Sequence, residues 1–487
     1  MRPVASAQMQ TRWIVGGVLL ALMLLCFYIF FPTTTNPTLA STTGQETSSP
    51  STSQSVSWKR DGIDWPRILG PTGNLQSTEK DFLSEWPENP PIVWTLPTGV
   101  GYGNGVAAQG RFFQFDRFGN QERVTCYAAE AGTELWKWEA PVEYSDMYNY
   151  NNGPRCSPVV DQDQVVCYGV SGRLSCLHAQ TGKLQWSVDT NKQYGVIQNF
   201  FGVSSNPVFY KNLVIAMVGG SPEDSKNVPP GQLTLVKPNG SGMVAFDRNS
   251  GKEVYRTGNY LASYSAPILA DIDGKTWCLA LMREGLLVFD PDTGKEADFF
   301  SWRAKSNESV NAASPVVLGN EIFISETYEI GSVRLRFENQ KLTELWKDPI
   351  RQRDQLMRSH WATPIADGQY LFGSSGRNEP DSDLRCVDWK NEKVMWAVRT
   401  HQRANLLKIE DYFVVVLEHG QVLLMKNNPE KFEKVALYDF ELITDPKTGR
   451  PLLESPVWAP PVYSHGYLYL RGAHTLVCLD LRKQVAK

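Results

Sequence analysis

A repeat of about 50 residues runs through most of the chain and constrains the fold more than any other feature. Its clearest copy contains Ser157-Pro158-Val159-Val160, two apolar segments at 165–168 and 174–177, and Thr181-Gly182-Lys183-Leu184-Gln185-Trp186. Each copy therefore begins at a small residue followed by proline, and its last segment carries an aromatic residue. Four short strands separated by turn residues predict one blade of a β-propeller.

Eight copies of the repeat can be recognised. Their starts are Gly105-Val106, Ser157-Pro158, Asn206-Pro207, Ala266-Pro267, Ser314-Pro315, Thr363-Pro364, Asn405-Leu406 and Pro460-Pro461. The last copy stops after three strands, but Pro90-Pro91-Ile92-Val93-Trp94 has the pattern of a fourth strand. An open ring would leave unpaired strand edges, so we expect this N-terminal segment to complete the last blade. The predicted fold is an all-β, eight-bladed propeller.

Three positions of the repeat carry characteristic residues. The turn before the last strand contains Thr-Gly-Lys at Thr181 and Thr293 and Ser250-Gly251-Lys252, where glycine permits a positive φ. Cysteine recurs in the third strand, at Cys126, Cys176, Cys386 and Cys478. Cys156 and Cys167 lie on adjacent predicted strands, where they could pair or remain free. The expected closing aromatic residues are Trp136, Trp186, Tyr255, Trp302 or Phe300, Trp346, Trp396 and Tyr438.

These repeats resemble the tryptophan-docking blades of the pyrroloquinoline quinone (PQQ)-like propeller family, which includes quinoprotein alcohol dehydrogenases and the lipoprotein BamB. The segments 64–71 and 240–247 also resemble those of membrane-anchored PQQ-like proteins from planctomycete-type bacteria. The resemblance covers residues 64–480. It implies that tryptophans of the outer strands dock onto the neighbouring blade, a structural role for Trp94, Trp136, Trp186, Trp346 and Trp396.

The N-terminal residues predict a membrane anchor. Trp13 to Phe31 contains no charge and is long enough to span a bilayer as a helix. Arg2 and Arg12 precede it, which favours a cytoplasmic N-terminus and an exported remainder. We therefore expect a cytoplasmic segment 1–12, a transmembrane helix 13–31, a Ser/Thr-rich tether 32–57 and the propeller 58–487 outside the cytoplasm. The alternative is a signal peptide cleaved after Thr38-Leu39-Ala40.

Polar and aromatic residues gather in the loops that precede the first strand of each repeat. Such loops open into the central channel of a propeller, so they predict a site for a ligand or partner. The alternative is that the asparagines only cap strands and turns. A long insertion at 219–240 could cover one mouth of the ring. The predicted mouth residues are Tyr102, Asn104, Asn152, Arg155, Asn199, Tyr264, Asn311, His360, Trp361, Arg403, Asn405 and Trp458.

The sequence offers no recognisable catalytic or metal-binding motif. It contains neither a CxxC nor an HxxxH pattern, and its aspartates recur at repeat positions. The resemblance implies that a quinoprotein dehydrogenase would hold PQQ and Ca²⁺ through Glu, Asn and Asp beside a vicinal cysteine pair. This chain has no adjacent cysteines, so PQQ and Ca²⁺ are possible ligands without an assigned site.

Composition narrows the function further. With 48 Lys and Arg against 52 Asp and Glu, the formal net charge is −4, which argues against a nucleic-acid partner. We expect a monomeric, non-catalytic scaffold that binds protein or peptide partners in the cell envelope. A quinone-dependent alcohol or sugar dehydrogenase, and a propeller that binds carbohydrate or another small ligand, are the alternatives.

Overall fold

The computed structural model describes residues 47–48 and 56–483, except 197–200, 230–231, 308, 351–353 and 447. The chain divides into two units, Met1–Gly44 and Gln45–Lys487, and all described residues belong to the second. The predicted membrane helix 13–31 and most of the predicted tether lie outside them. In the part that is described, no helix combines the length and apolar character needed to cross a membrane.

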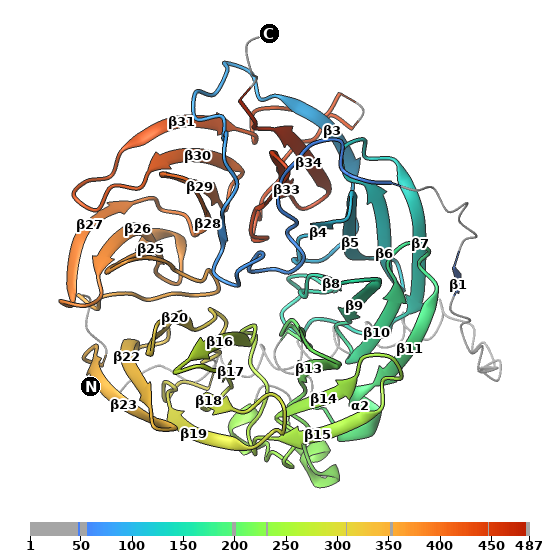
Figure 1. The fold of residues 1–487 in the computed structure, drawn as a ribbon, viewed down its shortest axis with the longest axis vertical. Coiled ribbons are helices and arrows are strands. Elements are labelled where there is room, and N and C mark those ends of the chain that lie inside the picture. The colour runs from blue at the N-terminus through green and yellow to red at the C-terminus, as the bar shows by residue number, and fades with distance from the viewer. Residues whose placement is uncertain are drawn as a thin grey trace, which may run out of the picture. The chain divides into compact units, whose positions relative to one another are not determined.

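The described residues form eight antiparallel sheets arranged around a central axis (Figure 1), which confirms the predicted eight-bladed propeller. Each blade has four main strands, with the first nearest the axis. Two short strands extend this pattern: β1 (Thr47–Ser48) pairs with the outer strand of the first blade, and β2 (Gln76–Ser77) pairs in parallel with the inner strand of the seventh.

The strands of the first four blades follow one another along the chain. Blade 1 contains β4 (Val106–Ala108), β5 (Arg111–Phe118), β6 (Gln121–Ala128) and β7 (Glu134–Pro141). Blade 2 contains β8 (Val159–Asp161), β9 (Gln164–Tyr168), β10 (Arg173–His178) and β11 (Leu184–Asp189). Blade 3 contains β12 (Val208–Tyr210), β13 (Leu213–Met217), β14 (Met243–Asp247) and β15 (Glu253–Thr257). Blade 4 contains β16 (Ile268–Ile272), β17 (Lys275–Leu281), β18 (Gly285–Phe289) and β19 (Glu296–Ser301).

Blades 5 to 7 repeat this order, and blade 8 takes its outer strand from the N-terminal side. Blade 5 contains β20 (Val316–Leu318), β21 (Glu321–Glu326), β22 (Gly331–Glu338) and β23 (Lys341–Lys347). Blade 6 contains β24 (Ile365–Asp367), β25 (Tyr370–Ser375), β26 (Asp383–Asp388) and β27 (Lys393–Arg399). Blade 7 contains β28 (Ala404–Ile409), β29 (Tyr412–Leu417), β30 (Gln421–Lys426) and β31 (Lys434–Asp439). Blade 8 contains β32 (Val462–Ser464), β33 (Tyr467–Arg471), β34 (Thr475–Asp480) and β3 (Ile92–Pro97).

Short helices occur only in connections within the described ranges. They are α2 (Thr190–Tyr194) and the 3-10 helices η1 (Glu223–Asn227), η2 (Leu233–Leu235) and η3 (Glu379–Asp381).

The ring closes where the N-terminal strand β3 joins the last blade, as predicted. It pairs antiparallel with β34, and Ile92 lies opposite Leu479 while Trp94 lies opposite Cys478. Figure 1 shows the early strand β3 beside the late strand β34. The four third-strand cysteines, Cys126, Cys176, Cys386 and Cys478, share this register. Each of them lies opposite a tryptophan of the outer strand. All seven described cysteines are free and buried, so Cys156 and Cys167 are not paired.

Three outer-strand tryptophans, Trp94, Trp136 and Trp186, link consecutive blades by docking onto a glycine of the next blade's turn. The indole Nε1 of Trp136 donates to the carbonyl oxygen of Ala179 at 3.1 Å. Its ring covers Gly182, where φ is +69° and an added Cβ would lie 2.4 Å from the ring. Trp94 and Trp186 repeat this contact with Ala129 and Arg248, at 3.0 and 2.7 Å. The glycine thus supplies both the turn and the docking surface.

Two of the expected closing aromatic residues lie on the outer strands but not at the position that Trp136 occupies in blade 1. The outer strand has a β-bulge that recurs in several blades, and in blade 4 the residue at the tryptophan position beside it is Asp298. Phe300 lies two residues further along, and Trp302 follows the strand. Asp298 instead accepts a hydrogen bond from the backbone N–H of Leu342 in blade 5, at 2.8 Å. In blade 7, Tyr438 is displaced from the bulge in the same way. Alternate residues of a strand share a face, so the sequence pattern could not distinguish these positions.

An N-terminal segment, residues 64–83, fills the centre of the ring; we call it the plug. Trp65 exchanges two backbone hydrogen bonds with Ala107 of blade 1, at 2.7 and 3.0 Å. The segment then crosses to blade 7 through β2, and Leu83 donates to the carbonyl oxygen of Leu481 beside blade 8. Trp65 and Phe82 are fully buried. Figure 1 shows this part of the chain running across the middle of the propeller.

Candidate functional site

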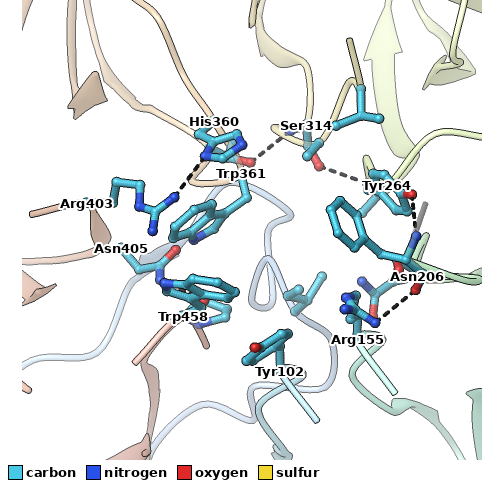
Figure 2. Close-up of a pocket in the computed structure, with 18 of the residues that line it drawn as sticks. Tyr102, Arg155, Asn206, Tyr264, Ser314, His360, Trp361, Arg403, Asn405 and Trp458 are labelled. Atoms are coloured by element: carbon cyan, nitrogen blue, oxygen red, sulfur yellow. Dashed lines mark hydrogen bonds between the residues drawn. The ribbon is translucent and has the colours of Figure 1, made fainter. Parts of the chain in front are cut away.

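A cavity of about 400 Å³ opens at the mouth of the channel, and the plug closes its inner end. Ile68, Leu69 and Leu75 of the plug line it, together with residues from the loops that precede the inner strands. Figure 2 shows the plug chain behind the side chains of these loops. Because the plug fills the channel, the cavity is a pocket on one face of the ring, of the size typical of ligand sites. We call it the mouth pocket.

The structure brings together most of the predicted mouth residues. Eight line the pocket: Tyr102, Arg155, Tyr264, His360, Trp361, Arg403, Asn405 and Trp458. Asn199 lies outside the described residues. The insertion at 219–240 contributes none of its described residues to the pocket, because it packs instead on the connection after β11. There, Asn239 donates to the carbonyl oxygen of Tyr194 at 2.9 Å.

Three predicted asparagines have structural roles instead of lining the pocket. Asn104 Nδ2 donates to the carbonyl oxygen of Pro460 at 2.8 Å, which links blade 1 to blade 8. Asn311 Nδ2 donates to the carbonyl oxygen of Met282 at 2.8 Å, and Asn152 Oδ1 accepts from the backbone N–H of Asp146 at 2.7 Å. These amides satisfy backbone groups that the loops would otherwise leave unpaired.

Aromatic rings form much of the pocket wall. Trp458 lies between Tyr102 and Trp361, with ring centroids 4.6 and 5.1 Å away. On the opposite side, Phe201 contacts Tyr264 at 5.6 Å, and its backbone N–H donates to the Tyr264 hydroxyl at 3.0 Å. Burial raises the pKa of Tyr102 to about 12, so its hydroxyl is neutral at physiological pH. The wall therefore offers uncharged, apolar faces to an occupant (Figure 2).

Two arginines in the wall are held by buried carboxylates that stand behind them. Arg403 binds Glu418 through both ends of its guanidinium group, and Nε lies 2.8 Å from Oε2. Trp458 Nε1 donates to the same carboxylate at 2.6 Å. Burial alone would raise the pKa of Glu418, but the hydrogen bonds and charge of Arg403 lower it below its usual value. One carboxylate thus fixes both the arginine and the indole.

Arg155 is held in the same manner on the other side of the pocket. Its guanidinium group contacts the fully buried carboxylate of Asp146 at 2.6 Å and donates to the carbonyl oxygen of Phe201 at 2.9 Å. The cation also lies over the rings of Tyr102 and Phe201, at 5.3 and 5.1 Å. Arg403 similarly covers Trp361 at 4.5 Å. Ion pairs and cation–π contacts therefore keep the wall rigid.

His360 is neutral in this environment. Burial, reinforced by the charges of Arg403 and Arg377, lowers the pKa of His360 to about 3. Arg403 can only donate, so its contact at 3.4 Å makes Nδ1 the acceptor. The ring proton is therefore on Nε2, which donates to the hydroxyl of Tyr328 at 3.1 Å. His360 has no carboxylate partner there that would raise its basicity.

The residues of the pocket do not fit a site for Ca²⁺ and PQQ of the kind expected from the resemblance. Ca²⁺ requires several oxygen ligands, generally including carboxylates. None of the described lining residues is Asp or Glu, and Glu418 and Asp146 already bind arginines. In the described parts of the chain, no three His, Cys, Asp or Glu side chains gather in a metal-binding arrangement.

The fold and this one-sided pocket define an eight-bladed propeller with a closed channel. The chain matches a protein-family model described as "Outer membrane protein assembly factor BamB" over residues 71–228 and 122–398. Because these matches span more than half of its length, the chain belongs to this PQQ-like repeat family. No curated protein matches the chain.

Solved structures with the same fold are distant in sequence. BamB from Moraxella catarrhalis is 13% identical, with 81% of this chain and 99% of that chain covered and a TM-score of 0.52. The quinohemoprotein alcohol dehydrogenase from Comamonas testosteroni is 14% identical, with 87% and 81% covered and a TM-score of 0.46. At such identities these similarities concern the fold alone.

Several pocket residues were not predicted from the sequence. Tyr150 and Phe201 lie beside predicted residues in long connections, and Tyr328 and Arg377 come from the other connections on this face, between second and third strands. A search of both loop types in each repeat could have found them. The plug residues carried no signal of this kind, because their position depends on a chain crossing that no local pattern encodes.

Proposed function

We propose that the protein is a non-catalytic binding protein of the cell envelope, anchored by the helix 13–31, whose mouth pocket receives part of a protein or peptide partner. The observation that carries this proposal is a pocket whose aromatic and arginine side chains are fixed by carboxylates behind the wall. Preorganised side chains lose little conformational entropy on binding, which favours affinity. The BamB-like family membership is consistent with a scaffold role.

The rim of the pocket supports a macromolecular partner. Tyr150 is 60% exposed and Tyr148 is 46% exposed, in the connection between β7 and β8. Their rings lie 6.3 Å apart, and Tyr150 contacts Trp458 inside the pocket at 6.3 Å. Exposed aromatic residues continuous with a concave site are typical of protein interfaces. A partner segment would thus contact the rim and place one or two side chains in the pocket.

A quinone-dependent dehydrogenase has less support, because the pocket lacks the ligand set described above. If the protein is a non-catalytic scaffold, incubation of the purified full chain with PQQ and Ca²⁺ should give no quinone absorbance in the protein fraction. No dye reduction with alcohols or sugars follows. Reconstituted activity would replace the scaffold proposal with an enzymatic one.

Crosslinking in intact cells tests the scaffold proposal directly. We expect Tyr150→Ala and Trp458→Ala each to reduce recovery of the crosslinked partner several-fold, since both remove aromatic contact area. The control is Val254→Ala, because Val254 is an exposed apolar residue on the outer strand β15, away from the pocket lining. Near-ultraviolet circular dichroism checks that each variant is folded. Equal recovery from all folded variants would contradict the proposal.

Localisation needs a separate test. Treatment of spheroplasts with an external protease should degrade the propeller, because the positive residues before 13–31 favour an exported remainder. Protection of the propeller until the membrane is lysed would contradict the proposed topology without bearing on the pocket.

A further inference from the structure

The mouth pocket is rich in hydrogen-bond donors and poor in anionic acceptors. Of its described lining residues, Arg155, Arg377 and Arg403 contribute guanidinium groups and none contributes a carboxylate. The carboxylates of Asp146 and Glu418 are not among the lining groups, because each is buried behind the arginine that it binds. Because carboxylates already balance the charges of Arg155 and Arg403, the remaining positive charge is that of Arg377, and an occupant that accepts hydrogen bonds and carries negative charge would complement it.

Arg377 differs from the other two arginines. It lies in the connection between β25 and β26, is exposed, and places its guanidinium carbon 4.6 Å above the ring of Tyr328. Across the described ranges, no carboxylate comes within ion-pair distance of it. An arginine that rests on a ring and has no anionic partner retains its planar pair of N–H donors for a ligand. The adjacent Asn378 also lines the pocket.

Two further observations concern polar side chains inside the mouth pocket. Ser204 lines the pocket and is only 7% exposed, and its Oγ has no hydrogen-bond partner in the described structure. Burial is the main cause of the lowered pKa of His360, and the nearby charges of Arg403 and Arg377 lower it further. Buried hydroxyl groups are normally hydrogen-bonded, so Ser204 Oγ is open to a hydrogen bond from a ligand atom or a water molecule.

The apolar walls add a second requirement. Trp361, Trp458 and Tyr102 form a continuous aromatic surface, and their successive ring centroids are 5.1 and 4.6 Å apart. Flat groups pack against such surfaces through offset or edge-to-face contacts. A small inorganic anion would leave these walls unoccupied and would not fill a cavity of about 400 Å³.

We propose that the mouth pocket binds a carboxylate borne by an aromatic group, with Arg377 contacting the carboxylate and Trp361 and Trp458 packing against the ring. This inference rests on the proposed function, since it takes the mouth pocket as the binding site. The same chemistry is found in a free aromatic acid and in the C-terminal aromatic residue of a peptide, and the experiment separates these two sources.

Calorimetric titration of the purified full chain provides the test. The probes are N-acetylphenylalanine, its amide, acetate, and the peptide acetyl-Gly-Gly-Gly-Phe with a free carboxylate. We expect N-acetylphenylalanine or the peptide to bind at least tenfold more tightly than the amide and acetate, since each of these lacks one of the two recognised groups. Tighter binding of the peptide identifies a chain end as the source, and equal or tighter binding of N-acetylphenylalanine identifies a free acid.

Variants assign the carboxylate contact. Arg377→Gln should reduce the affinity for the carboxylate probe at least tenfold and leave that for the amide unchanged, while Arg377→Lys retains part of the preference. The matched control is Arg399→Gln, because Arg399 is an exposed arginine on the outer strand β27 of the same blade. It should bind like the parent protein.

Three outcomes would overturn the inference. The first is equal affinity for N-acetylphenylalanine and its amide, and the second is equal affinity for N-acetylphenylalanine and acetate. The third is a preference for the carboxylate probe over the amide that persists in Arg377→Gln. If no probe binds while partner crosslinking still depends on Tyr150 and Trp458, the proposed scaffold function stands and only the ligand class is wrong.

Discussion

The docking of Trp136 onto the turn of the next blade can be tested by adding one methyl group at Gly182. In Gly182→Ala the new Cβ would lie 2.4 Å from the Trp136 ring, far inside van der Waals contact. The indole would have to move, which breaks its 3.1 Å hydrogen bond to the carbonyl oxygen of Ala179. Trp136 is only 2% exposed, so it has little room for another position.

The expected magnitude has two parts. Alanine at φ +69° costs roughly 1–2 kcal/mol from backbone strain alone. Displacing the indole adds about 1 kcal/mol for the hydrogen bond and about 1–3 kcal/mol for overpacking. We therefore expect Gly182→Ala to lower the free energy of unfolding by roughly 3–6 kcal/mol. Gly119→Ala is the matched control, because its φ is +57° and nothing lies within 4 Å of the added Cβ.

Denaturant unfolding of the full chain measures both variants. The difference between them should be at least about 2 kcal/mol, since only Gly182 faces an indole. Repeating the pair in a Trp136→Ala background removes the obstacle, so Gly182→Ala should then cost no more than Gly119→Ala. An unchanged cost of Gly182→Ala in that background would refute the docking explanation.

Two other predictions concern buried carboxylates. Burial raises the pKa of Glu122 to about 7 from its ordinary 4.5, so the folded state favours its protonated form and Glu122 destabilises the protein progressively as the pH rises from 4.5 to 7. Between pH 4.5 and 7.5, the free energy of unfolding of Glu122→Gln should therefore rise by roughly 3 kcal/mol relative to that of the parent protein, as measured by denaturant unfolding. Unfolding free energies that change with pH in the same way in both proteins would contradict this. Glu418→Gln leaves the partly buried Arg403 without its anion and should cost about 2–4 kcal/mol at pH 7. Asp381→Asn, which breaks the more exposed pair with Arg358, should cost less than about 1 kcal/mol, and equal costs would argue against the role of Glu418.

The blades were predictable from the sequence because their determinants are local. Proline immediately precedes β8, β12, β16, β20, β24 and β32, where the missing N–H is tolerated at the start of a strand. Glycine follows at the turn and an aromatic residue at the outer strand, within one repeat. Even the non-local closure by β3 could be inferred, since a three-stranded last blade requires a partner. The two misassigned aromatic positions depended on a β-bulge, which a period-two pattern does not reveal.

The plug could not be predicted in this way. Trp65, Leu69 and Leu75 read as apolar residues before the first repeat, and nothing in their spacing indicates that they cross a channel. Their place follows from contacts with blades 1 and 7, which are distant in the sequence. The plug nevertheless decides the form of the site, because without it the channel mouth would lead into an open channel.

Repetition also explains which mouth residues bind the ring together and which face a ligand. Polar side chains before or at the start of the inner strand link neighbouring blades: Asn104 to Pro460, Ser205 to Ser265, and Asn405 to Trp458. A link needed at every blade boundary must recur, so periodicity reveals it. An asymmetric ligand, in contrast, requires side chains that differ between blades. Residues that interrupt the repeat, such as Arg377 and Trp361, are therefore the ones to examine for specificity in a propeller of this kind.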